Sequence, residues 1–163
     1  MVQKMVKGGI SMLEQLREWL EGWPGWDSTP AIAIDGLDLA GGAVSLRPGG
    51  ASESNFKENI LGGGRLSTSY RFWLELRLEK PVGDPGAGLH NAALVLALQD
   101  WVNTQNARGR VPQLFESGRQ SLRAQGAGLQ QAGPDGLARY RLELVAEHIT
   151  ELKGETDGEE QEN

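Results

Sequence analysis

The side chains that most often carry out catalysis or bind metals are few in this chain of 163 residues, and they are far apart. His90 and His148 belong to neither H-x-x-x-H nor H-E-x-x-H, the spacings that place two zinc-binding imidazoles on one face of a helix. No serine occupies the G-x-S-x-G nucleophile elbow of a hydrolase. The chain has no cysteine, and therefore no thiolate nucleophile, thiolate metal site or disulfide. We interpret the two histidines as surface or helix-cap residues.

Two further segments have compositions found in binding sites. Gly62, Gly63 and Gly64 are not followed by the lysine and the serine or threonine of a phosphate-binding loop, so a tight turn explains them better. The acidic residues near the C-terminus lack the glycine and the spacing of a calcium loop, which favours a solvated tail. They include Asp157, Glu159, Glu160 and Glu162.

The sequence therefore predicts no catalytic residues, no metal site and no cofactor, and we expect a protein that is not an enzyme. The alternative from a different class is a small ligand-binding domain or hydrolase that uses a pocket between a sheet and its helices.

The net charge of −6 is concentrated at the C-terminus. The last ten residues, GETDGEEQEN, hold five acidic residues and no basic one, which leaves 17 acidic and 16 basic residues before Gly154. Such a segment cannot bury enough apolar surface to offset its ordering entropy, so we expect residues 151–163 to form a disordered acidic tail. The remainder is nearly neutral and has no basic run, so we expect no direct sequence-specific binding to nucleic acid.

The longest apolar run, Ala92–Leu98, is far shorter than the ~20 residues of a membrane span. The N-terminal residues include lysines but lack the apolar core of a signal peptide. We therefore expect a soluble protein with no membrane partner, and the lack of cysteine suits a reducing cytosol.

The segment Ser67–Lys80 alternates between apolar and polar side chains, which is typical of a strand with one buried and one exposed face. Its apolar face comprises Thr68, Tyr70, Phe72, Leu74, Leu76 and Leu78, and its polar face comprises Ser69, Arg71, Trp73, Glu75, Arg77 and Glu79. The pattern returns in residues 137–147, where Tyr140, Leu142, Leu144 and Ala146 alternate with Arg139, Arg141, Glu143 and Glu147. Both strands need a cover on their apolar side only.

Turn residues delimit the other strands. Residues 31–35 and 43–47 are predicted to form a hairpin, and residues 54–61 a second hairpin with Ser67–Lys80 through the three glycines. Residues 121–131 and 137–147 form the last pair, because Pro134 presets φ and Gly136 takes the left-handed conformation in the turn between them.

Two amphipathic helices are predicted. The first, roughly Met12–Glu21, begins with a capping box of Ser11 and Glu14. Its apolar stripe comprises Leu13, Leu16, Leu20 and Trp23. The second follows PVGDPGAG and spans about Leu89–Asn106. The apolar side chains that we expect to face the sheet are Leu94, Leu98, Trp101 and Val102.

The order of elements is helix, four strands, helix, two strands. It predicts an α+β fold, with a mostly antiparallel sheet and two helices packed on one face, in a single domain of residues 12–150. Residues 1–11 are a flexible or non-native extension. Lys7-Gly8-Gly9 can be encoded by AAAGGAGGN, a bacterial ribosome-binding sequence, which would place the start of translation at Met12. The other interpretation is a native flexible arm that keeps Ser11 as a helix cap.

The second face of the sheet is left bare by this arrangement, and it carries a tryptophan among charges. Trp19 and Trp101 lie on helices and are expected in the core, whereas Trp73 is either covered by another part of the chain or meets another protein. Aromatic residues and arginine are enriched at interface centres. The candidate assembly interface comprises Lys57, Arg65, Arg71, Trp73, Arg77, Arg139 and Arg141.

The segment Asp100–Leu114 resembles the pattern W-V-x-x-Q-N-x-x-G-x-L-P-x-L of small prophage proteins from Gram-positive bacteria, called phage minor capsid or tail terminator proteins. The matching residues are Trp101, Val102, Gln105, Asn106, Gly109, Pro112 and Leu114. The resemblance extends over most of Met12–Val145, through LEQLREWLEG, FKENILGGGRLSTSYRFW and ARYRLEL. Its specificity lies in the order and spacing of these motifs together.

The resemblance implies a structural role in the virion. Tail terminators are α+β domains that assemble as a ring, commonly hexameric, at the end of the tail tube and provide the joining surface for the head. The implied partners are further copies of the chain, the tail tube protein and a head completion or connector protein, with synthesis in the cytoplasm of a bacterial host. Another minor capsid or tail completion protein at the same junction is the alternative within this class. The alanine-rich start of the second helix and the acidic tail depart from the family pattern.

Overall fold

The computed structural model describes residues 9–36, 41–50 and 53–153. Its order of elements, one helix, four strands, one helix and two strands, is the predicted one. The elements are α2 (Gly9–Glu21), β1 (Ala33–Ile34), β2 (Val44–Pro48), β3 (Glu53–Glu58), β4 (Gly64–Glu79), α3 (Pro85–Ala107), β5 (Arg119–Ala132) and β6 (Leu137–Leu152).

All six strands belong to one sheet in the order β1-β2-β4-β6-β5, and β3 also pairs with β4. β4 and β6 are antiparallel along their whole lengths, from Gly64 opposite Leu152 to Glu79 opposite Leu137. On its other edge, β4 pairs first with β3 and further along with β2. Every strand pair except β1–β2 is antiparallel, so the prediction of an α+β fold with a mostly antiparallel sheet is confirmed.

The predicted hairpin of residues 31–35 and 43–47 is wrong. β1 pairs with β2 in parallel, with Ala33 opposite Ser45 and Ile34 opposite Leu46. A hairpin reverses the chain once, whereas here Asp35 (φ 55) and Gly42 (φ 87) both adopt left-handed conformations and bend the chain at either end of the connection. The two other predicted pairs, β3–β4 and β5–β6, are confirmed.

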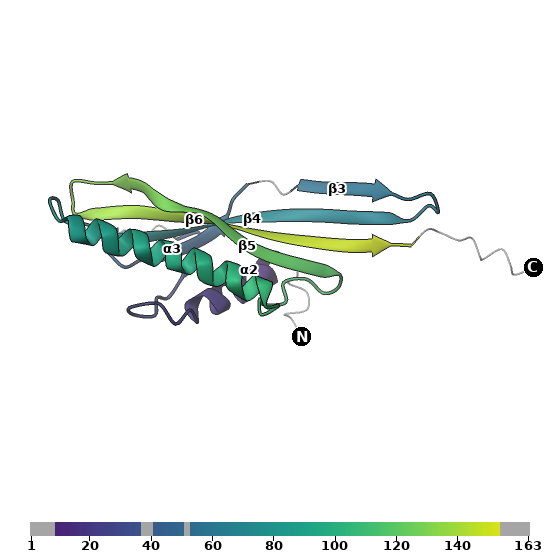
Figure 1. The fold of residues 1–163 in the computed structure, drawn as a ribbon, viewed down its shortest axis with the longest axis horizontal. Helices are drawn as coiled ribbons and strands as arrows, with labels where there is room; N and C mark the ends of the chain where they lie inside the picture. Colours follow the sequence, from purple (N-terminus) through teal and green to yellow (C-terminus); the bar gives the residue numbers. More distant parts are fainter. Residues whose placement is uncertain (1–8, 37–40, 51–52, 154–163) are drawn as a thin grey trace, which may run out of the picture.

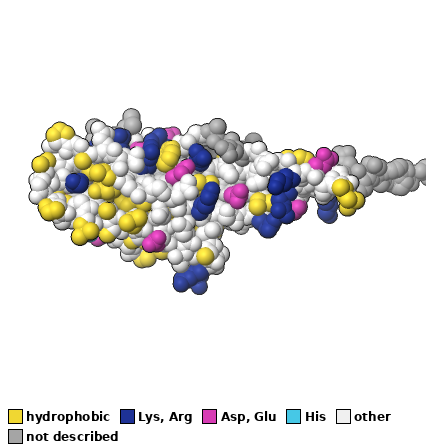
Figure 2. All heavy atoms as spheres, turned by 45° about the horizontal axis from the view of Figure 1, so that its top comes forward, with side chains coloured by type: hydrophobic (Ala, Val, Ile, Leu, Met, Phe, Trp, Pro, Cys, Tyr) yellow, Lys and Arg dark blue, Asp and Glu magenta, His cyan; other side chains and the backbone are white. Residues whose placement is uncertain are grey.

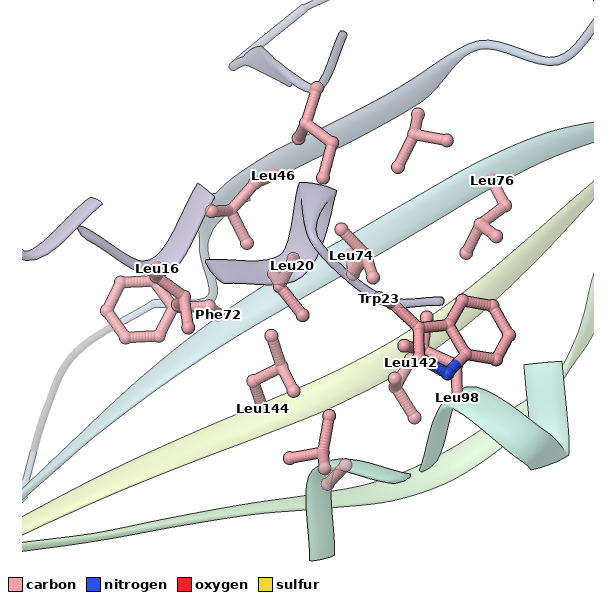
Figure 3. Close-up of a cluster of buried hydrophobic side chains, with 14 of the residues drawn as sticks. Leu16, Leu20, Trp23, Leu46, Phe72, Leu74, Leu76, Leu98, Leu142 and Leu144 are labelled. Carbon is pink, nitrogen blue, oxygen red and sulfur yellow. The ribbon is translucent and has the colours of Figure 1, made fainter. Parts of the chain in front are cut away.

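Both helices lie on the same side of the sheet, as predicted (Figure 1). Leu16 and Leu20 of α2, and Trp23 just after it, point toward leucines of β2, β4 and β6, and Leu98 of α3 joins them (Figure 3). Trp19 and Trp101 are half-buried; their rings stack with centroids 4.5 Å apart and link α2 to α3. The core therefore fills the space between one face of the sheet and two helices.

Both helices begin earlier than predicted. α2 starts at Gly9, so Ser11 lies inside the helix and the predicted capping box is wrong. α3 starts at Pro85, four residues before the predicted start, because Asp84 acts as its N-cap. The Asp84 carboxylate accepts hydrogen bonds from the amides of Gly86 and Ala87 at 3.0 and 3.3 Å. Proline at the first helical position is compatible with this start, since its missing N–H would have no helical partner.

Part of the sheet extends beyond the helices (Figure 1). We call this part the arm: β3, residues Gly64–Ser69 of β4 and residues Glu147–Leu152 of β6. We call the rest of the molecule, with both helices, the body. A stack of Tyr70, Phe115 and His148, with ring centroids 5.6 and 4.2 Å apart, lies where the arm leaves the body. β6 reaches Leu152, beyond the predicted domain boundary at residue 150, and residues 154–163 of the predicted acidic tail lie outside the described residues.

Neither of the described helices has the length and apolar character that a membrane span requires.

Candidate assembly surface

The seven residues of the candidate interface all point to the side of the sheet opposite the helices. Leu74 and Leu76 of β4 are buried under the helices, so the odd-numbered residues of β4 face away from them. Residues directly opposite each other on neighbouring strands share a face. The register pairs Lys57 with Arg65, Arg71 with Val145, Trp73 with Glu143, Glu75 with Arg141, and Arg77 with Arg139. We call this side of the sheet the charged face.

Trp73 lies in the middle of the charged face and is half-buried rather than part of the core. The guanidinium carbon of Arg141 lies 4.0 Å from the centroid of its ring, in a cation–π arrangement. Gly49, after β2, borders the indole closely: a Cβ at Gly49 would lie 2.9 Å from the indole nitrogen. Part of the chain therefore covers one edge of Trp73, and the remainder is accessible from the charged face.

Two glutamates on either side of Trp73 are held by arginine. Glu143 lies 3.3 Å from Arg71 and accepts a hydrogen bond from the Gln125 amide at 2.7 Å. Glu75 lies 2.8 Å from Arg47. The two carboxylate side chains are only 12 and 18% exposed, whereas the side chains of Arg47 and Arg71 are 39 and 50% exposed. Such pairs contribute about 0–1 kcal/mol each, so their main effect is to fix the positions of the side chains around Trp73.

Like charges lie opposite each other at both ends of the charged face. Lys57 faces Arg65 in the arm, and Arg77 faces Arg139 in the body. Like charges directly opposite on neighbouring strands are destabilising. Arg65 reaches Glu151 at 3.2 Å and Arg139 donates to Gln131 at 2.8 Å, but within the described ranges neither Lys57 nor Arg77 forms an ion pair. These two cationic pairs are suited to acidic groups of a partner.

The hydrogen bonds that protect the edge strand β5 were not predicted from the sequence. Asn103 accepts from the amide of Ala124 at 2.8 Å and donates to its carbonyl at 2.9 Å. Asn106 accepts from the amide of Leu122 at 2.9 Å, and Gln99 from that of Ala127 at 3.0 Å. Side chains of α3 thus take the place of a further strand along half of this edge, which shields it from pairing with other chains.

The signal for this contact is present in the sequence. Amides at positions 99, 103 and 106 follow the i, i+4, i+7 spacing of one helix face, and the neighbouring stripe of α3 is apolar. A stripe of amides next to the apolar stripe indicates a helix that packs over a sheet edge.

The remaining sequence candidates have structural roles. His90 is exposed and lies 3.2 Å from Asp27, and the His148 ring stacks on Phe115 with a nitrogen against the Ser117 carbonyl. The three glycines end the β3–β4 hairpin, where Gly62 has a φ of 90°. Within the described part of the chain, no three histidine or acidic side chains form a group that could hold a metal ion.

An open hollow of about 570 Å³ lies on the arm, not between sheet and helices. It is lined by Ser54, Asn55, Ser67, Ser69 and Glu147. A smaller apolar hollow of about 150 Å³ lies beside the first residues of α2 and the end of β2. The larger hollow offers hydroxyls, an amide and a carboxylate that accepts a hydrogen bond from Ser67 at 3.2 Å.

The chain matches none of the protein-family models and none of the curated proteins with which it was compared.

Proposed function

We propose that the protein is a virion assembly subunit, a tail terminator that forms a ring on the end of the tail tube and offers a joining surface to the head. The observation that supports this most directly is the charged face, a broad side of the sheet opposite both helices. A ring subunit needs two different contact surfaces for its neighbours and a further one for the tube. A fold whose helices cover only one side leaves such a surface available.

The chemistry of the charged face fits contact with another protein. Aromatic residues and arginine are enriched in interfaces, and Trp73 shares its face of the sheet with Arg71, Arg77 and Arg141. Intramolecular pairs already hold Arg71 and Arg141 in place, which lowers the entropy lost when a partner binds. Lys57 and Arg77, which form no ion pair with the described residues, leave positive charge for an acidic tube or connector protein.

The residues that match the tail terminator pattern make contacts within the chain that stabilise its fold. Val102 is in the core, Trp101 stacks on Trp19, and Asn106 holds the amide of Leu122. Gly109 has a φ of 68° just after α3, and the Pro112 carbonyl accepts a hydrogen bond from Gln120. The pattern therefore supports a shared way of attaching α3 to β5, and the role in assembly follows from it by resemblance.

The proposal is tested by adding the protein to tail tubes assembled from the tube protein of the same prophage. Trp73→Ala and Arg77→Glu are expected to keep the wild-type circular dichroism spectrum but to lose tube capping in negative-stain images. Arg110→Glu, which makes the same charge change at an exposed site after α3, is the matched control and should cap tubes normally. Loss of fold in Trp73→Ala would show that this side chain belongs to the core.

Failure of the wild-type protein to bind the tubes contradicts a tail terminator. If it binds the head connector instead, the protein is another completion protein at the same junction.

A further inference from the structure

The large apolar side chains that the chain exposes fall into two groups in different halves of the molecule. The first, which we call the arm set, comprises Phe56, Ile60, Leu61 and Leu152. The second, which we call the helix set, comprises Val82, Leu89, Leu96 and Leu129, on α3, on the turn before it and on the last part of β5. The arm and the start of α3 lie at opposite ends of the long axis (Figure 1).

The tip of the arm is built so that it presents apolar side chains. Ile60 is 100% exposed and Leu61 is 84% exposed. The turn that carries them is ordered by hydrogen bonds: the Asn59 amide donates to the Gly63 carbonyl at 2.8 Å, and the Asn59 side chain accepts from the Leu61 amide at 2.9 Å. Turns usually carry glycine, proline, asparagine, aspartate or serine, so two large aliphatic residues here are unusual. A fixed turn with two exposed aliphatic side chains is suited to insertion into an apolar surface.

α3 is apolar on its outer side as well as on its inner side. Its buried residues include Val95, Leu98 and Val102, while Leu89 is 74% exposed on the solvent side. Ala92, Ala93 and Ala97 are also exposed, and His90 and Asp100 are the two ionisable residues between Pro85 and Ala107. A helix that is apolar on two sides normally has a neighbour on each. Within the described chain, Asp27 reaches His90 at one point of the outer side, and Leu89, Leu96 and Ala97 remain exposed.

Charged side chains of both signs lie near each set. Asp84, Asp100 and Asp135 are exposed on and around the end of the molecule that carries the helix set. The arm carries Lys57, Arg65 and Lys153 together with Glu58, Glu147 and Glu151, and both Arg65 and Arg119 reach Glu151. Figure 2 shows apolar side chains gathered at one end of the molecule, whereas lysine and arginine side chains are spread along its length with acidic side chains among them. Lys57 and Lys153 of the arm can pair with the acidic residues near the helix set across a contact between two copies, and such pairs orient an encounter.

We propose that the arm of one copy docks on the outer face of α3 of the next copy, with the arm set packed against the helix set. Because the two surfaces differ, the contact is heterologous, and successive copies form a ring if the rotation closes. A symmetric arm-to-arm dimer would leave the helix set uncovered on both copies. This inference rests on the proposed function, which supplies the ring. It assigns the contacts between neighbouring subunits to the arm and α3. The charged face is then free to contact the tube.

Complementary variants test this contact. Ile60→Asp with Leu61→Asp disrupts only the arm set, and Leu89→Asp with Leu96→Asp disrupts only the helix set. Sedimentation velocity up to about 1 mM is expected to show concentration-dependent assembly of the wild-type protein. Each variant alone should associate about 30-fold more weakly or worse, the effect of losing a hot-spot side chain. A 1:1 mixture of the two variants retains one intact contact and should form dimers that stop there.

Other outcomes overturn the inference. Dimers of the helix-set variant alone, with no additional dimer formed on mixing it with the arm-set variant, would indicate an arm-to-arm contact. A wild-type protein that is monomeric at about 1 mM has no such contact of its own. If either double variant loses its fold, Leu61→Gln and Leu96→Gln repeat the measurement with milder changes. If the protein caps tubes but remains monomeric in solution, this inference is refuted and the proposed function stands. If it assembles head to tail but does not cap tubes, the proposed function is refuted and this inference stands.

Discussion

Strands β4 and β6 run through both the body and the arm, yet the two regions use the same pair of strands differently. In the body, Leu74, Leu76, Leu142 and Leu144 are fully buried under the helices. In the arm, the residues on the same face are Gly64, Leu66 and Thr68, opposite Leu152, Thr150 and His148. The hydroxyls of Ser54 and Thr68 lie 3.2 Å apart on this face, where the body has leucine against leucine.

The comparison shows that alternation along a strand defines its two faces but not what covers them. The arm keeps the alternation of the body and still has no helix over it, and its glycine is required by local packing. A Cβ at Gly64 would lie 2.4 Å from the Lys57 carbonyl and 2.6 Å from the Phe56 ring. Stability should therefore be concentrated in the body, and the arm should be the region in which substitutions change assembly.

The largest expected effect is that of Leu142→Ala in the body. Leu142 is fully buried between α2, α3 and the sheet, so its truncation should lower the free energy of unfolding by about 2–5 kcal/mol. Leu66→Ala, on the same face of the paired strand but in the arm, is the matched control and should cost about 1 kcal/mol or less. Denaturant unfolding measures both, and equal losses would contradict the difference between body and arm.

Asn103→Ala should come next, because Asn103 makes two hydrogen bonds to the edge of β5. The expected loss is about 1–3 kcal/mol, since the freed backbone groups of Ala124 are buried under α3. Hydrogen exchange at the Ala124 amide should become faster. Thr104→Ala, at the exposed neighbouring position, should leave that exchange rate unchanged.

On the charged face, the pair of Arg71 and Glu143 should contribute little. A double-mutant cycle with Arg71→Ala and Glu143→Ala is expected to give a coupling free energy of about 0.2–1 kcal/mol, because the arginine side chain is half exposed. The coupling should decrease as salt is added. A value comparable to that of a core substitution would show that this face is covered within the folded chain.

The smallest effect on stability is expected at the tip of the arm. Ile60→Asp with Leu61→Asp should leave the denaturation midpoint unchanged, because both side chains are already in solvent. The same double variant should lose self-association. A clear fall in the denaturation midpoint would show that the tip packs against the body. It would contradict the difference in stability between arm and body.

The sequence was sufficient for those elements in which local pattern and tertiary packing agree. Alternation in Ser67–Lys80 placed Arg71, Trp73 and Arg77 on one face, and the register confirms it. The hairpin of residues 31–35 failed because β1 has only two residues, too few for alternation to specify the direction of pairing. The sequence predicts the start of α3 four residues too late, because glycine and proline in PVGDPGAG indicate a break in the chain. Asp84 and Pro85 are also a favourable N-cap and first helical residue, and the structure uses them in this way.

The candidate surface was predictable as a face but not as a set of contacts. The sequence could not show that Arg141 lies over Trp73, or that Glu143 bridges Arg71 and Gln125, because these partners meet only through the register of three strands. The extent of the arm was also hidden, since it depends on where the helices end over the sheet. Whether the charged face binds a tube protein stays a prediction.

The uninterrupted pairing of β4 with β6 has a mechanical consequence. The sixteen residues of β4 are matched one to one, without a shift in register, from the tip region of the arm to the far end of the body. A force that pulls the tip along the strand direction loads all the hydrogen bonds between β4 and β6 in shear at once. The pairing of these two strands contains no bulge at which they could begin to separate. The arm should therefore bend little. When a neighbouring subunit displaces its tip, the layer formed by α2 and α3 should tilt as a rigid unit.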